Sequence, residues 1–195
     1  MKMNVSFKAS LVNYSTIIKR DPISKKEENY ISSFVELDPN DNADNQALRT
    51  VAYTWERGAS LANDVYDNFT ADRLRFRAFF ETGLKNIKFR YFALLSQNQS
   101  PNRDLDSDSI LGVASFIEEA DNTYTLQQIQ THPKHTHGSV DREYRHIGEA
   151  MMESILNLIQ KKEMKLFPID DGARAFYKKF NFKKIPRSDF MRFKL

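Results

Sequence analysis

The chain has 195 residues, of which 41% are hydrophobic and 28% are charged, and its net charge is +3. This composition is typical of a folded globular protein rather than a disordered one, and the length suits one domain with a single core. No apolar run approaches the roughly 20 residues that cross a bilayer. The first ten residues lack the apolar stretch of a signal peptide, and the absence of cysteine excludes disulfides and thiolate chemistry. We therefore expect a cytoplasmic protein with one domain, residues 1–195.

The charge is distributed unevenly along the chain. Residues 160–195 contain eleven Lys or Arg and four Asp or Glu, a net of +7, so the preceding residues sum to about −4. A basic C-terminal block indicates either a solvated lysine-rich face or contact with an anion, such as nucleic acid, an acidic surface or a phosphate-bearing cofactor.

The N-terminal half predicts helices after a weakly patterned start. Residues 3–7 are consistent with a strand, whereas residues 11–45 have interrupted apolar positions and end in the turn-forming segment LDPNDNADN. Asp44 or Asn45 is expected to cap a helix over residues 47–68, where apolar residues recur at helical spacing. Thr70 is expected to cap a second helix that follows it.

The C-terminal half alternates between strand and helix patterns. Apolar runs predict a meander of three strands over residues 89–96, 110–119 and 124–131. A helix (148–160), a strand (163–169), a helix (171–180) and a closing hairpin (182–195) follow. In the third strand Leu126 and Ile129 are three residues apart, so in a regular strand their side chains point to opposite faces. That strand is therefore either covered on both faces or bulged between them.

This order of elements predicts an α/β or α+β fold. Its central sheet is expected to be mixed but mostly antiparallel and flanked by helices. The strand–helix–strand unit near the C-terminus predicts one parallel pair.

The segment RHIGEA, from Arg145 to Ala150, has the features of an anion site. The first N–H groups of a helix lack internal partners and the helix dipole adds positive partial charge, so a loop that opens into a helix can hold a phosphate. The N–H groups of residues 147–150 would point at the anion, Gly148 would let the backbone approach closely, and Arg145 would add a charged fork. One glycine at the start of a helix is equally a feature of an ordinary core helix.

The same segment resembles the Arg/Gln-x-x-Gly-x-Gly/Ala loop with which the GNAT N-acetyltransferase superfamily grips the pyrophosphate of acetyl-coenzyme A. Downstream, DDGARAFYKKFNF resembles the N…A…FYxKxGF segment of that superfamily. The two matches occur in the family order with helix–strand spacing between them, and the resemblance covers residues 110–195. Three positions depart from the pattern. His146 replaces a glycine, Asp171 replaces an Asn, and Asn181 replaces a glycine at a left-handed position that Asn also tolerates.

The resemblance implies an acetyl-CoA-dependent N-acetyltransferase, in which a primary amine of a small molecule or peptide attacks the acetyl group directly in a ternary complex. It implies that Tyr177 protonates the departing thiolate, although a helix tyrosine can equally serve only to pack its ring. Backbone groups of Ile129 and Thr131 would hold the pantetheine arm and the thioester oxygen, and Lys178 or Lys179 would meet the 3′-phosphate. The residues that would hold the pyrophosphate are Arg145, His146, Ile147, Gly148, Glu149 and Ala150, with the Glu149 side chain turned outward.

The general base has two candidates. His132 titrates near neutrality and ends the strand beside the expected thioester, whereas Glu118 would act through water. All four histidines lie between His132 and His146, but the segment HPKHTH has no ligand from a second rigid segment, so we expect no metal.

Two other functions fit the sequence. One is a protein of the same fold that binds acyl-CoA or a partner without turnover. The other is a nucleic-acid-binding module, which is disfavoured because the basic block has few interleaved aromatic residues. No membrane partner is expected, a homodimer is left open, and the sequence carries no signature of the acceptor.

Overall fold

The computed structural model describes residues 9–55, 64–70, 87–96, 105–119, 123–136, 139, 142–160 and 162–194. The strand expected over residues 3–7 and the helix expected after Thr70 lie outside this set. The labelled helices and strands are, in chain order, β1 (Ser10–Arg20), β2 (Glu27–Leu37), α1 (Asn42–Trp55), β3 (Ile87–Leu95), β4 (Ile110–Glu119), β5 (Tyr124–Thr131), β6 (Tyr144–Arg145), α3 (Ile147–Leu158), β7 (Met164–Leu166), α4 (Asp171–Lys178), β8 (Lys183–Lys184) and β9 (Met191–Phe193).

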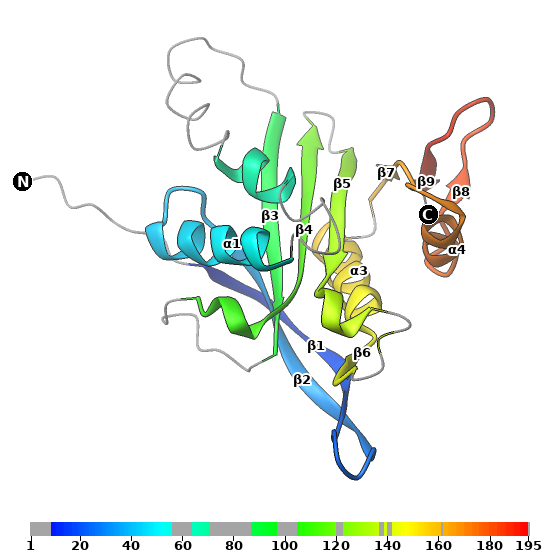
Figure 1. The fold of residues 1–195 in the computed structure, drawn as a ribbon. Helices are drawn as coiled ribbons and strands as arrows, with labels where there is room; N and C mark the ends of the chain where they lie inside the picture. The colour runs from blue at the N-terminus through cyan, green and yellow to red at the C-terminus, as the bar shows by residue number, and fades with distance from the viewer. Residues whose placement is uncertain are drawn as a thin grey trace, which may run out of the picture.

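The strands form one mixed sheet in the order β6-β1-β2-β3-β4-β5-β7-β9-β8. Two hydrophobic clusters, one packed by α1 and one by α3, lie on its opposite faces (Figure 1). The β1–β2 hairpin extends from one end of the sheet, and β8, β9 and α4 lie at the other end. The mixed α/β architecture and the flanking helices are those that the sequence predicts. Among the described helices, none is long and apolar enough to cross a membrane.

The N-terminal hairpin is not predicted by the sequence pattern. β1 and β2 pair antiparallel from Ser10–Glu36 to Arg20–Glu27, but only Ile17 of β1 is buried. The turn that joins them has no glycine. The carboxylate of Asp21 stabilises the turn by accepting the N–H groups of Ile23 and Ser24 at 2.9 and 2.6 Å. The pattern of residues 11–45 was too weak to predict these strands, because β1 is partly exposed on both faces and the second half of β2 is buried on both faces.

Helix α1 begins earlier than expected. The carboxylate of Asp41 accepts the N–H groups of Ala43 and Asp44 at 2.8 and 3.1 Å, so Asp41 caps the helix. Asp44 is buried and accepts the N–H of Asp38 at 2.9 Å. The prediction of a cap at Asp44 or Asn45 was therefore wrong. The helix expected over residues 47–68 is present as α1 and again in residues 64–70, and residues 56–63 lie outside the described set.

The C-terminal half has the predicted elements. β3, β4 and β5 form the antiparallel meander, and β5 and β7 form the parallel pair. The pairing of β4 with β5 passes from Ser115–Gln128 to Phe116–Leu126 and so skips Gln127. The parity break in β5 is therefore a bulge. Asn181, which follows α4, has a φ of 64°, the left-handed conformation predicted for it.

Close packing on β4 fixes the start of α3. Phe34, Phe92 and Phe116 form a stacked row across β2, β3 and β4 with ring centroids 5.2 and 5.1 Å apart, and α3 packs on this row. A Cβ at Gly112 of β4 would collide with the sulfur of Met151 and lie 3.2 Å from the Ile147 side chain. Gly112 therefore lets the first turns of α3 sit directly on the sheet.

Candidate active site

β5, α3 and α4 meet where β5 extends past the end of β7. In the described part of the chain, β7 pairs with Tyr124–Leu126 of β5, and the remaining residues of β5 run on to Thr131 without it. α3 begins beside this free end. A Cβ at Gly148 would lie 3.7 Å from the methyl group of Thr131 and 3.3 Å from the ring of Phe176 on α4. We call the residues around this meeting point, His146 to Glu149, the cradle.

The cradle offers three N–H groups rather than four. The N–H of Ala150 donates to the His146 carbonyl at 2.9 Å, so it is already used inside the helix. The expectation that Ala150 donates to a ligand was therefore wrong, and its buried methyl group packs in the core instead. The N–H groups of Ile147, Gly148 and Glu149 belong to the first turn, which has no carbonyls before it to pair with.

His146 takes the backbone conformation of the glycine that it replaces. It precedes α3 with φ 61° and ψ 21°, in the left-handed region, which costs a non-glycine residue roughly 1–2 kcal/mol. Its side chain makes no capping hydrogen bond, is 55% exposed and places Nδ1 3.9 Å from the Glu149 carboxylate. The substitution therefore leaves the loop in the conformation that opens into the helix.

Two cations lie beside the cradle, and both contact carboxylates. Arg145 Nη1 is 2.5 Å from Glu27 Oε1 at the start of β2, and Lys179 Nζ is 3.4 Å from Glu149 Oε1. The Glu149 side chain therefore reaches toward α4. Within the described residues the Nε–H of Arg145 is buried without a hydrogen-bond partner. A buried donor without a partner, on the residue that precedes the cradle, is compatible with an anionic ligand.

Tyr177 lies on α4 in an aromatic environment. Only 8% of it is exposed, and its ring centroid is 5.2 Å from that of Phe176 and 5.8 Å from that of Phe182. Burial raises the pKa of the phenol to about 12. The hydroxyl is therefore protonated at neutral pH.

His132 follows the end of β5 and packs against α1. Its ring centroid is 4.9 Å from that of Trp55 and 5.3 Å from that of His135. Burial, with a smaller contribution from Lys134, lowers the pKa of His132 below 6.5, so the ring is neutral at pH 7. Nδ1 accepts the N–H of Lys134 at 3.1 Å, which assigns the ring proton to Nε2.

Glu118 lies at the other end of β4. It is opposite Tyr124, whereas Gly112 is opposite Thr131, and six residues of strand span about 20 Å. Its carboxylate is 3.8 Å from Arg90 and accepts the hydroxyl of Tyr124 at 3.4 Å. The structure therefore brings Thr131, the cradle and α4 together and leaves Glu118 apart from them.

Gln130 is a candidate site residue that the sequence reasoning did not name. Only 7% of it is exposed, and within the described residues neither atom of its side-chain amide has a hydrogen-bond partner. It lies opposite Val113, on the face of the sheet that α1 covers. Buried amides are almost always paired, so an orphan in this position indicates a binding surface. The bulge in β5, one of the two alternatives that the sequence left open, turns this polar residue toward the α1 face, but its burial there has no local signal in the sequence.

Comparisons with known proteins support the fold. No family model matches the sequence, and no curated protein matches it significantly. A GNAT-family acetyltransferase structure from Staphylococcus aureus Mu50 matches 83% of this chain and 97% of its own, with a TM-score of 0.50 and 13% identity. A mutant AtaT toxin bound to the C-terminus of its antitoxin AtaR and acetyl-CoA matches over 83% and 92% (TM-score 0.48, 13% identity). A KacTA–DNA complex matches over 61% and 78% (TM-score 0.39, 13% identity).

At this level of identity the likeness shows the fold alone. The chain has the fold of the GNAT N-acetyltransferases.

Proposed function

We propose that this protein transfers an acetyl group from acetyl-CoA to a primary amine of a small molecule or peptide. The observation that carries the proposal is the meeting at Gly148 of the first turn of α3, Thr131 at the free end of β5 and Phe176 of α4, the residue before Tyr177. The N–H groups of Ile147, Gly148 and Glu149 suit a pyrophosphate, and the buried orphan donor of Arg145 adds a charged partner. The exposed backbone edge of Ile129 and Thr131 suits the amide groups of the pantetheine arm.

The reaction needs a neutral amine and a proton donor. The amine nitrogen forms a bond to the acetyl carbonyl carbon, the carbon–sulfur bond breaks, and the electron pair leaves with sulfur. Tyr177, protonated at neutral pH, gives its proton to the thiolate. A base takes the proton that the amine loses, and return of one proton to Tyr177 completes the cycle with no net change in the protein.

We assign the removal of the amine proton to His132 rather than to Glu118. His132 is unprotonated at pH 7 and follows Thr131, whereas Glu118 is about 20 Å along the strand and engaged by Arg90. Proton uptake has to occur at Nδ1 of His132, at the expense of the hydrogen bond from Lys134. A His132→Gln variant should remove the acid limb of the pH–rate profile, and an unchanged limb would exclude this assignment.

We assign the acceptor to the α1 face of β5, where the Gln130 amide lacks a partner. A Gln130→Leu variant should raise KM for the acceptor and leave acetyl-CoA affinity unchanged. It should also stabilise the free protein by about 1 kcal/mol or more, because an unsatisfied buried amide is removed. A variant with an unchanged KM would exclude Gln130 from the acceptor site.

Calorimetry and an amine panel test the proposal as a whole. Acetyl-CoA should bind with micromolar affinity, and at least one amine in a panel of polyamines, amino acids and peptides should release CoA. Absence of acetyl-CoA binding would refute the proposal.

A second function is favoured by one observation. The pKa of Tyr177, about 12, lies well above the roughly 8.5 of a thiol, so transfer of its proton to the thiolate is unfavourable. This favours a protein that binds acyl-CoA without turnover. Acetyl-CoA binding without CoA release across the whole amine panel would select this alternative.

A further inference from the structure

The outer face of β7, β9 and β8 carries a row of cations. The register pairs Lys165 with Arg192 and Arg192 with Lys183, so the three side chains occupy equivalent positions on adjacent strands. Neighbouring strands are about 4.8 Å apart. The alternate residues of β7 and β9 are buried, which places Lys165 and Arg192 on the side of the sheet away from the core.

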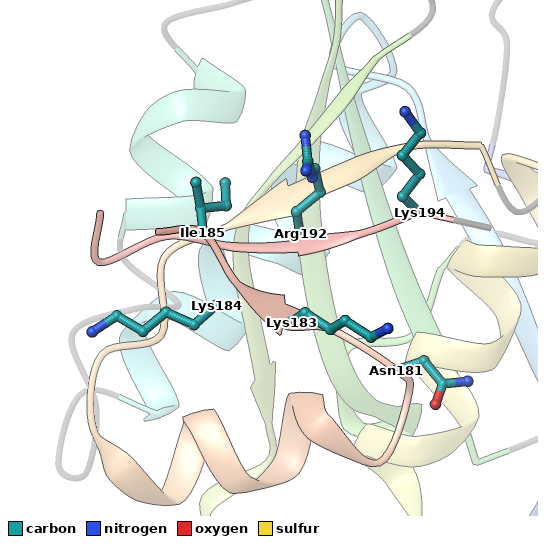
Figure 2. Close-up of a pocket in the computed structure, with 6 residues that line it drawn as sticks. All are labelled: Asn181, Lys183, Lys184, Ile185, Arg192 and Lys194. Atoms are coloured by element: carbon teal, nitrogen blue, oxygen red, sulfur yellow. The ribbon is translucent and has the colours of Figure 1, made fainter. Parts of the chain in front are cut away.

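A pocket opens around this row at the edge of the sheet. Its volume is about 340 Å³, and its lining residues are Asn181, Lys183, Lys184, Ile185, Arg192 and Lys194. Figure 2 shows Arg192 and Lys194 projecting from the same side of β9. Four of the six lining residues are cations and none is acidic. The nearest paired carboxylate is Glu163, 3.7 Å from Arg192, and it offsets one of these charges.

An exposed aromatic pair lies beside the cations. Phe167 and Phe190 are 58% and 41% exposed, and their ring centroids are 5.6 Å apart. Phe167 directly follows β7 and Phe190 directly precedes β9, and each is two residues from a cation of the row, so the two rings lie beside Lys165 and Arg192. Exposed apolar patches beside polar residues mark interaction sites.

We propose that this face, formed by Lys165, Lys183, Arg192, Lys194, Phe167 and Phe190, binds single-stranded nucleic acid. Single strands are held by cations that follow the phosphate backbone and by aromatic rings on which bases stack, and both are present here side by side. The sequence disfavoured nucleic acid because the basic block has few interleaved aromatic residues. The structure shows that two aromatic residues of this block, Phe167 and Phe190, are exposed beside the cations. The inference is independent of acyl transfer.

Fluorescence anisotropy with labelled 20-nucleotide oligouridine, oligodeoxythymidine and a duplex of equal length tests the proposal. With four cations in contact, log K should fall with log salt with a slope near −3, since each phosphate contact on a single strand contributes about −0.7. Both single strands should bind more tightly than the duplex. The comparison of oligouridine with oligodeoxythymidine distinguishes RNA from DNA as the natural ligand. Absence of binding at 50 mM salt, or equal binding of the duplex, would overturn the proposal.

Two pairs of variants separate charge from stacking. Lys183→Gln with Arg192→Gln should make the salt slope shallower by about 1.4, whereas Lys25→Gln with Lys26→Gln, on the exposed β1–β2 turn, should leave it unchanged. Phe190→Ala should weaken binding on the order of 5- to 100-fold without a change in slope, whereas Tyr53→Ala, an exposed ring on α1, should have no effect.

Sedimentation of the same variants distinguishes nucleic acid from a second copy of the chain. If the wild-type protein is a dimer that Phe190→Ala dissociates, the face is a subunit interface and the proposal fails. An equal loss of binding in the control variants would also overturn it.

Discussion

Gly148→Ala separates the phosphate-binding role of the cradle from its packing role. The added Cβ would lie 3.3 Å from Phe176 Cζ and 3.7 Å from Thr131 Cγ2, so the half-buried Phe176 ring must move by a few tenths of an ångström. Against this small cost, alanine in a helix is favoured over glycine by roughly 0.5–1 kcal/mol. The two terms nearly cancel. We expect the free energy of unfolding to change by less than about 1 kcal/mol and Tm by less than about 4 °C.

Ligand binding should respond much more strongly. A methyl group at residue 148 holds a phosphate oxygen away from the N–H groups of the first turn, and a hydrogen bond to a charged group contributes about 1.5–3 kcal/mol. Acetyl-CoA affinity, measured by calorimetry, should therefore fall on the order of 10- to 100-fold. Gly172→Ala is the matched control, because Gly172 is the second residue of α4 as Gly148 is of α3, and its Cβ would meet only the Asp170 carboxylate at 3.3 Å. Unchanged acetyl-CoA affinity in Gly148→Ala would refute the cradle as the phosphate site.

Three further substitutions have defined outcomes. Tyr177→Phe keeps the ring packing, so it should lower kcat strongly while acetyl-CoA affinity and Tm stay nearly unchanged; a preserved kcat would exclude Tyr177 as the acid. His146→Gly relieves the left-handed strain, so urea unfolding should show a stability gain of up to about 1 kcal/mol, and a loss would mean that the imidazole contributes more than its contact with Glu149. Burial raises the pKa of Asp44 from 3.8 to about 7. The folded chain therefore holds this proton more tightly than the unfolded chain, so the free energy of unfolding declines as pH rises from 4 to 7. Asp44→Asn should therefore become more stable relative to wild type across that window, by at most about 4 kcal/mol, and a constant difference between the two would contradict the shift.

The C-terminal half could be predicted because its local signals agree with its tertiary environment. β4 and β5 are bounded by turn residues and packed between helices, so their apolar runs coincide with the observed strands. The parity break between Leu126 and Ile129 left two alternatives, a strand covered on both faces or a bulge, and the register with β4 shows the bulge. The cradle was predicted from Gly148 in the same way, although the unavailability of the Ala150 N–H depends on where the helix begins.

The N-terminal half could not be predicted for a physical reason. β1 is stabilised by its pairing with β2 and by contact with α3, and its half-exposed residues carry no period of two. Its Ser15 hydroxyl lies 2.6 Å from that of Ser154 on α3, a contact between residues far apart in sequence. Such long-range pairing leaves no trace in a local pattern. The orphan amide of Gln130 is similar, because only the packing of α1 over β5 makes that side chain buried.

The β1–β2 hairpin, which the sequence pattern does not predict, supports the cradle, which the sequence pattern does predict. β6, which precedes the cradle, pairs with Ile18 and Lys19 at the end of β1. The N–H of Arg20 donates to the Glu143 carbonyl at 2.7 Å, and Glu27 at the start of β2 holds Arg145. These contacts fix the chain immediately before His146, and the first turn of α3 fixes the chain immediately after it. A non-glycine residue keeps a left-handed conformation only where its surroundings over-determine it, and here the hairpin supplies half of that constraint. Loss of the hairpin contacts would therefore loosen the cradle without altering any residue of the two motifs that identify the fold.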